Sequence, residues 1–197
     1  MGTADNIWRE FFMDLSSEWC AVFIDGGYLA KVLKDEFDEP RIDFLRLSEE
    51  ICPGKRLRTY YYNTLPYRGS YPDEKEKQRY QRARSFFDTI DRLNRFEVVL
   101  GKTVKRYTYD GKMFFIQKGV DVRLAVDLVR LSWAGHIKIA VLIAGDNDFV
   151  PAVKAAKDAG VIVKLYYSKN SSSDELLSAV DEAEEITWEL INRCKRY

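Results

Sequence analysis

Four aspartates carry the chemistry that this sequence supports most directly. Asp25 closes a short apolar run, and Asp146 and Asp148 directly follow the apolar run IKIAVLIAG. Asp121 opens a helical pattern, where a carboxylate also interacts favourably with the helix dipole. Carboxylates without local basic partners repel one another, and a hard cation that prefers oxygen ligands, such as Mg²⁺, relieves that repulsion. The pattern predicts a divalent metal site formed by the four.

Such a site would have a definite chemistry. A bound Mg²⁺ or Mn²⁺ ion can generate hydroxide from water, orient a phosphodiester and stabilise the leaving oxygen, and two ions about 4 Å apart could divide these roles. The alternative is structural, because an Asp after a strand is a common turn former, and Asp146 alone could simply cap the following helix. The pair G-D-x-D over residues 145–148, taken together with Asp25, favours a metal or phosphate site.

Further polar residues lie beside these acids in the sequence. Lys118 precedes Asp121 by three residues and could contact a scissile phosphate, or it could be an edge lysine that opposes aggregation. Asn147 stands between two aspartates and could orient water or phosphate, or serve only a turn. Asp127 lies six residues past Asp121, about 240° around a helix, and a solvated side chain is the favoured interpretation there.

Several other reaction types find little support. His136 is the only histidine, which excludes a ribonuclease built on a histidine pair and argues against Ser-His-Asp and Cys-His catalysis. No G-x-x-x-x-G-K-[ST] phosphate loop is present, and Gly26-Gly27 is too short for a G-x-G-x-x-G dinucleotide turn.

The elements that would position the acids alternate along the chain. Apolar runs predict strands over 21–25, 56–63, 96–100, 137–145 and 161–167, helical spacing predicts helices over 28–37, 43–51, 73–93, 120–133, 149–159 and 174–195, and Asp110-Gly111 predicts a hairpin turn. This alternation predicts a three-layer α/β/α Rossmann-like fold with a central, mainly parallel sheet. Ligands in such folds bind at the carboxyl ends of the strands, near a change in strand order.

The length of 197 residues suits one domain with a small appendage. We expect a helical extension over residues 1–19, with Ile7, Trp8 and Phe11 at helical spacing, and one domain over residues 20–197. No apolar run approaches the ~20 residues that span a bilayer, and the N-terminus lacks the pattern of a secretory signal. Three cysteines far apart in the sequence fit a reducing cytoplasm. The sequence also permits a homo-oligomer.

Charge is distributed unevenly although the formal net charge is zero. Residues 52–112 hold fifteen Lys and Arg against seven acidic residues, whereas residues 1–51 hold five against twelve. This asymmetry permits a basic face for phosphates, or it reflects ordinary solvated helix faces. An RNA-contacting arm, or equally a plain exposed ribbon, could be formed by the basic residues that interleave with Tyr107 and Tyr109, which are Arg68, Lys102, Lys105, Arg106 and Lys112. Alternation along a strand turns at least one of Tyr60, Tyr61 and Tyr62 to the core. The others could stack on bases.

The sequence resembles a known family in several segments. VFIDGGYL (22–29), KGVDVRLAVDLV (118–129), VLIAGDNDFVPAVKAAKDAGVIVKLYY (141–167) and ELLSAVDEAEEIT (175–187) look like the NYN domain of LabA-like proteins, in the PIN-like nuclease superfamily. The resemblance covers about residues 20–190 in the family's order. It implies a Rossmann-like core and a metal-dependent ribonuclease, with the metal ligands falling on Asp25, Asp121, Asp146 and Asp148.

One position departs from the family's pattern. Many relatives have Asn two residues after the first Asp, where this chain has Gly27. The main hypothesis is an endoribonuclease that uses Mg²⁺ or Mn²⁺ to hydrolyse RNA. A non-catalytic RNA-binding or protein-interaction module is the alternative. A phosphatase of the haloacid dehalogenase type is less favoured, because its D-x-D motif requires an acid where Gly27 stands.

Overall fold

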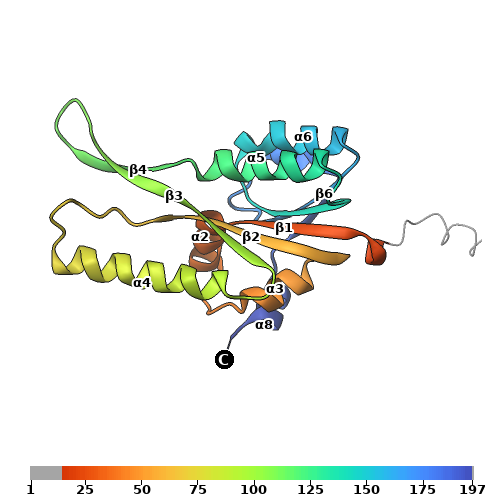
Figure 1. Ribbon diagram of the computed structural model, residues 1–197, viewed down its shortest axis with the longest axis horizontal. Coiled ribbons are helices and arrows are strands. Elements are labelled where there is room, and N and C mark those ends of the chain that lie inside the picture. Colours follow the sequence, from red (N-terminus) through yellow and green to blue (C-terminus); the bar gives the residue numbers. More distant parts are fainter. Residues whose placement is uncertain (1–14, 197) are drawn as a thin grey trace, which may run out of the picture.

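Seven strands form the centre of the structure, a computed structural model that describes residues 15–196 (Figure 1). They are β1 (Trp19–Asp25), β2 (Lys55–Leu65), β3 (Phe96–Tyr107), β4 (Met113–Lys118), β5 (Ile139–Ile143), β6 (Ile162–Tyr167) and β7 (Glu182–Glu185). One sheet joins them in the order β4-β3-β2-β1-β5-β6-β7. Every neighbouring pair is parallel except β3 and β4, which form the predicted hairpin.

Helices cover both faces of this sheet. They are α2 (Gly26–Glu36), α3 (Phe44–Glu50), α4 (Glu74–Asp91), α5 (Val120–Trp133), α6 (Val150–Asp158), α7 (Asp174–Ala179) and α8 (Trp188–Cys194), with 3-10 turns η1 (Leu15–Ser17) and η2 (Asn147–Phe149). One hydrophobic core lies between the sheet and α2, α3, α4 and α8, and a second lies between the sheet and α5, α6 and α7. Figure 1 shows the two helical layers on opposite sides of the strands. The predicted three-layer α/β/α fold is confirmed.

The central strands are apolar because both of their faces are covered. All five residues of β5 are buried, and so are the five residues 20–24 of β1. Side chains alternate between the two cores: Val22 and Ile24 enter one, and Ala21 and Phe23 enter the other. A strand buried on both faces needs this continuous apolar sequence, which is the pattern that identified both strands.

The strand order reverses between β1 and β5. From β1 the chain builds outward through β2, β3 and β4, and it then returns to place β5 on the other side of β1, followed by β6 and β7. β1 and β5 are parallel and in register, with Ile24 opposite Ile143. Their carboxyl ends therefore lie side by side, at the point where open α/β sheets bind ligands.

The prediction of helix over residues 174–195 is wrong in its middle. The segment forms α7, then the edge strand β7, then α8. Glutamates favour helix in isolation. Here Lys164 of β6 pairs with Glu182 (3.6 Å) and Glu184 (2.5 Å), which are two residues apart on β7 and therefore point to the same side of the strand. The Lys164 ammonium holds the pKa of Glu184 below its ordinary value. Tertiary pairing thus overrides local helix propensity.

The helical extension predicted over residues 1–19 lies mostly outside the described residues. Its last part forms η1 and the start of β1 instead. A side chain at Gly54 would place its Cβ 2.5 Å from the backbone oxygen of Glu18 and 2.7 Å from that of Leu15, so the close approach of this segment requires glycine. The division into an extension over 1–19 and a domain over 20–197 stays a prediction.

None of the helices within residues 15–196 is both long enough and apolar enough to cross a membrane.

Replacing Lys164 should loosen β7. In Lys164→Ala the two glutamates lose their cation, and we expect the free energy of unfolding to fall by about 1 kcal/mol, with faster hydrogen exchange of the β7 amides. Exchange followed by mass spectrometry checks this. Lys154→Ala, which removes an exposed lysine of α6, is the control and should leave β7 unchanged. Equal exchange in both variants would show that the ion pairs do not hold the strand.

Candidate active site

Asp25 is both the last residue of β1 and the N-cap of α2. Its Oδ1 accepts hydrogen bonds from the backbone N–H groups of Gly27 (2.9 Å) and Tyr28 (3.0 Å). An N-cap carboxylate satisfies donors that a helix start leaves unpaired. Its Oδ2 has no hydrogen-bond partner within residues 15–196. One oxygen therefore anchors the side chain, and the other is available to a ligand.

Two glycines let the neighbouring backbone segments approach closely here. A Cβ at Gly26 would lie 2.5 Å from the Tyr61 ring, and a Cβ at Gly145 would lie 2.3 Å from the Tyr28 ring and 2.4 Å from the Ser171 backbone oxygen. The glycine of G-D-x-D is thus required by packing against α2 and the loop after β6. It brings the turn after β5 against the turn after β1.

Asp146 and Asp148 occupy the turn after β5. Asp146 is the N-cap of η2, and its Oδ1 accepts a hydrogen bond from the backbone N–H of Asp148 (3.0 Å). The capping role considered from sequence is therefore present. The carboxylate of Asp148 forms no hydrogen bond or ion pair within the described residues and is exposed. Phe149, only 1% exposed, anchors the turn in the core.

Asp121 lies in the first turn of α5, beside an apolar groove. Gly119 precedes this helix with φ 82°, and no side chain caps it. Asp121 and Asp148 both line a groove of about 830 Å³ between α5 and α6, whose walls include Val126 and Pro151. The acids of two separate loops thus share one surface.

Electrostatics show that the four carboxylates act on one another. Burial raises the pKa of Asp25, the charges of Asp121 and Asp146 raise it further, and the two backbone hydrogen bonds partly offset these effects. Burial also raises the pKa of Asp121, followed by the charges of Asp146 and Asp148. Within residues 15–196 no basic side chain forms an ion pair with any of the four.

The oxygen atoms suit a hard cation but do not enclose one. Among the described residues, no group of three or more His, Cys, Asp or Glu side chains is arranged to hold a metal ion. Unpaired carboxylates of the same charge are nevertheless the donor set that Mg²⁺ and Mn²⁺ accept, and Mg²⁺ commonly retains several waters and binds substrate phosphate. The chemistry of these donors, though not their arrangement, is therefore that of a site for a hard divalent cation.

Lys118 and Asn147 lie at the margins of this group. Lys118 is exposed at the end of β4, opposite Lys102 in the antiparallel ladder. The Nδ2 of Asn147 donates a hydrogen bond to the Oε2 of Glu175 (3.3 Å), which directs the amide toward α7. The structure brings neither side chain into contact with the four carboxylates, and their substrate-binding roles stay predictions.

Two interpretations of β2 and α5 are corrected. Tyr60, Tyr61 and Tyr62 are all buried, so none can stack on a base, because helices cover both faces of β2. Asp127 is not merely solvated: it accepts hydrogen bonds from the hydroxyl of Tyr62 (3.1 Å) and from Arg130 (3.0 Å). These contacts give Asp127 a structural role on the α5 face of the sheet.

Sequence reasoning missed the role of Tyr28. Its hydroxyl accepts a hydrogen bond from the backbone N–H of Ser168 (2.8 Å) and lies 2.9 Å from the Ser172 hydroxyl, while its ring packs on Gly145. Tyr28 therefore connects α2, the turn after β5 and the loop after β6. Its partners lie more than a hundred residues away in the chain, and no local pattern carries that information.

The fold and the acidic edge together define a Rossmann-like α/β/α domain with a carboxylate site at its switch point. The model of the NYN domain family matches residues 20–187. The chain belongs to this family, whose members are generally associated with nuclease activity. No curated protein matches the chain.

A solved structure of low sequence identity has the same fold. A protein of unknown function from Vibrio parahaemolyticus shares 17% identity with a TM-score of 0.58, over 88% of this chain and 95% of that one. A candidate oxidoreductase from Parabacteroides merdae shares 12% identity with a TM-score of 0.32, over 89% of this chain and 33% of that one. The second score is too low to carry an argument, and the first supports the fold alone.

The mutual repulsion of the acids can be measured directly. In an NMR titration of side-chain carboxyls, Asp25 should titrate above its ordinary pKa of 3.8, and Asp121→Asn should move its pKa down because one repelling charge is removed. Asp88→Asn, on exposed α4, is the control and should leave Asp25 unchanged. A metal would compete with protons, so its affinity should weaken as the pH falls through the raised values. An Asp25 carboxyl insensitive to Asp121→Asn would contradict the proximity of the two.

Proposed function

We propose that this protein is an endoribonuclease that hydrolyses RNA phosphodiester bonds with Mg²⁺ or Mn²⁺ held by Asp25, Asp121, Asp146 and Asp148. The observation that carries the proposal is the convergence of mutually repelling carboxylates, without basic partners among the described residues, at the switch point of the sheet. Membership of the NYN family supports nuclease activity in general. The segment G-D-N-D-F-V-P favours the LabA-like group within the family.

The four acids would hold the metal as two pairs. A bound metal supplies a water of lowered pKa and a positive charge for the phosphate oxygens. Asp25 and Asp146 are fixed by backbone hydrogen bonds through one oxygen each and present the other. Asp121 and Asp148 lie on the groove side and would face the substrate. Lys118 would neutralise a neighbouring phosphate, and Asn147 would orient water once it leaves Glu175.

We also propose a cellular compartment and a partner for this protein. Cys20 and Cys194 are buried and Cys52 is half-buried, all as free thiols, which supports a reducing cytoplasm. RNA is the proposed partner. A homo-oligomer is compatible with the exposed apolar residues of α5, where Val122 is 67% exposed and Trp133 65%.

A non-catalytic RNA-binding module is the second candidate. The observation that favours it is the lack of a ready-made metal-binding group within residues 15–196. Calorimetric titration with Mn²⁺ separates the two candidates. Binding that is lost in Asp146→Asn supports the nuclease, whereas RNA binding without Mn²⁺ binding at millimolar concentration supports the module.

Removing one carboxylate should abolish cleavage without unfolding the protein. In Asp146→Asn we expect the rate of Mg²⁺-dependent or Mn²⁺-dependent RNA cleavage to fall by about 100-fold or more, because replacing a residue that only hydrogen-bonds to a metal ligand already costs about 10–100-fold. The melting temperature should change little, because Asn is also a good N-cap. Asp158→Asn at the end of α6 is the matched control and should retain full activity. Full cleavage by Asp146→Asn would refute the assignment.

Many relatives have Asn where this chain has Gly27, and restoring that Asn tests whether its polar side chain contributes to cleavage. An added Cβ at Gly27 would lie 3.3 Å from Asp25 Oδ1, a tight contact that requires a shift of a few tenths of an ångström. Gly27→Asn should raise the cleavage rate several-fold, because its amide can hydrogen-bond water or phosphate at the site. Gly27→Ala is the control for the gain in helix propensity alone. If Ala and Asn have the same effect, the amide contributes nothing.

A further inference from the structure

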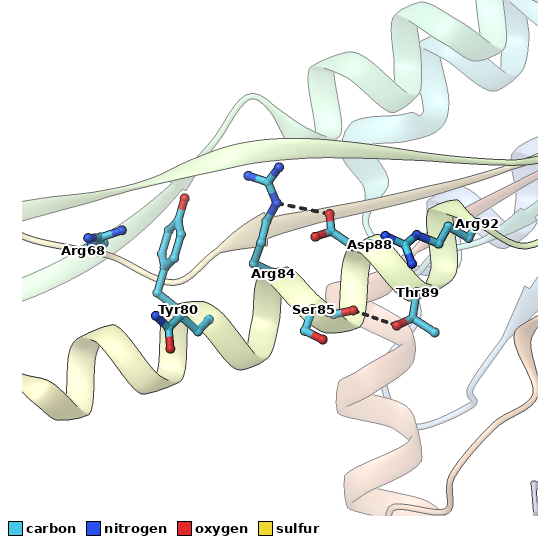
Figure 2. A pocket seen from close by; sticks show the side chains of 8 residues that line it. Arg68, Tyr80, Arg84, Ser85, Asp88, Thr89 and Arg92 are labelled. Atoms are coloured by element: carbon cyan, nitrogen blue, oxygen red, sulfur yellow. Dashed lines mark hydrogen bonds and ion pairs between the residues drawn. The ribbon is translucent and has the colours of Figure 1, made fainter.

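Three arginines line a hollow on the outer surface of α4. The hollow has a volume of about 350 Å³, and its lining includes Arg68, Arg84 and Arg92, which we call the arginine row. Figure 2 shows Tyr80, Arg84 and Asp88 projecting from the same side of α4, with Arg68 entering from the loop after β2 and Arg92 at the far end. The proposed cleavage chemistry makes no use of this hollow.

Two of the three guanidinium groups in the row are not paired with an acid among the described residues. Arg84 pairs with Asp88 (3.2 Å), but neither Arg68 nor Arg92 has an acidic partner within salt-bridge distance among the described residues. The guanidinium of Arg68 lies 5.3 Å from the centre of the Tyr80 ring, which orients it without neutralising it. Two unneutralised guanidinium groups therefore face one hollow, and such groups bind phosphates with two parallel hydrogen bonds.

A second hollow extends from this row to the base of the β3–β4 hairpin. It has a volume of about 630 Å³, shares Arg68 and Tyr80 with the first, and extends to Gly101 and Lys102. Lys102 stands opposite Lys118, a like-charged pair that costs stability in a sheet. Lys118 is followed by Gly119 and the first turn of α5, which carries Asp121. Cations thus run from α4 to the base of the hairpin, where Lys118 stands three residues before Asp121 in the chain.

We propose that a single strand of RNA lies along this path, with its phosphates on Arg92, Arg84 and Arg68 and its backbone passing Lys102 and Lys118 toward the acids. The inference rests on the proposed function and adds the route by which substrate is held. Arg84 and Arg92 are eight residues apart, about 12 Å along the helix axis, so successive cations can meet phosphates along one extended strand.

A single strand fits better than a duplex because rings accompany the cations. Tyr80 lies inside both hollows, and Tyr107 and Tyr109 of the hairpin are exposed. Lys105 lies 5.4 Å from the centre of the Tyr107 ring. Unpaired bases stack on such rings while a basic groove holds the backbone, which is how proteins bind single-stranded nucleic acid.

The test uses two pairs of substitutions on the same helix. Arg84→Gln with Arg92→Gln neutralises the row. Lys75→Gln with Arg82→Gln removes the same charge from exposed positions that do not line the hollow, and point away from it by helical spacing. Affinity for a fluorescent single-stranded RNA is measured by anisotropy in the full chain, without divalent metal, over a range of salt concentrations. A duplex RNA of the same length is the second probe.

We expect the first pair to weaken single-strand binding about tenfold. The slope of log affinity against log salt concentration should become shallower by about 1.4, which corresponds to the loss of two phosphate contacts. The second pair should change affinity less than threefold, and the duplex should bind more weakly than the single strand. Equal losses in both pairs, or preferential duplex binding, would overturn the path. This experiment measures binding and not cleavage, so the two proposals can fail separately. If the protein binds RNA through the row but fails to cleave RNA in the separate cleavage assay, the nuclease is refuted and the path stands.

Discussion

The whole arrangement depends on β1 and β5 lying side by side with both faces buried. That burial requires uninterrupted apolar sequence in each strand, so polar groups can appear only where the strands end. The strand order reverses between these two, and the helices that follow them diverge, α2 into one layer and α6 into the other. The space between their first turns receives Asp25 and Asp146.

Repulsion at this edge is tolerated because other interactions hold the acids in place. Asp25 and Asp146 each cap a helical turn, and Gly145 packs on the Tyr28 ring. Tyr28 in turn binds the loop after β6 through Ser168. The backbone therefore fixes the charges from outside the site, and the energy of their repulsion remains available to stabilise a bound cation.

The parts of the fold that local sequence determines were predictable. Apolar periodicity located the strands and most helices, and the strand-end positions of Asp25, Asp146 and Asp148 followed from it. Non-local contacts were not predictable. The strand β7 exists because Lys164 and the edge of β6 pair with it, and the burial of Tyr60, Tyr61 and Tyr62 follows from helices supplied by distant segments. The link that Tyr28 makes across the site belongs to the same category.

The four aspartates fall into two kinds, those that cap a helical turn and those that do not, and the two kinds are under different evolutionary constraints. Asp25 and Asp146 each satisfy backbone donors, so losing either would weaken a helix start as well as a ligand set. Asp121 and Asp148 have no such duty among the described residues. In a lineage that stopped using the site, folding alone would continue to retain the first two, while the second two would be free to drift. If the proposed chemistry is correct, Asp121 and Asp148, rather than the capping acids Asp25 and Asp146, are therefore the residues whose presence in a relative would report that it is still in use.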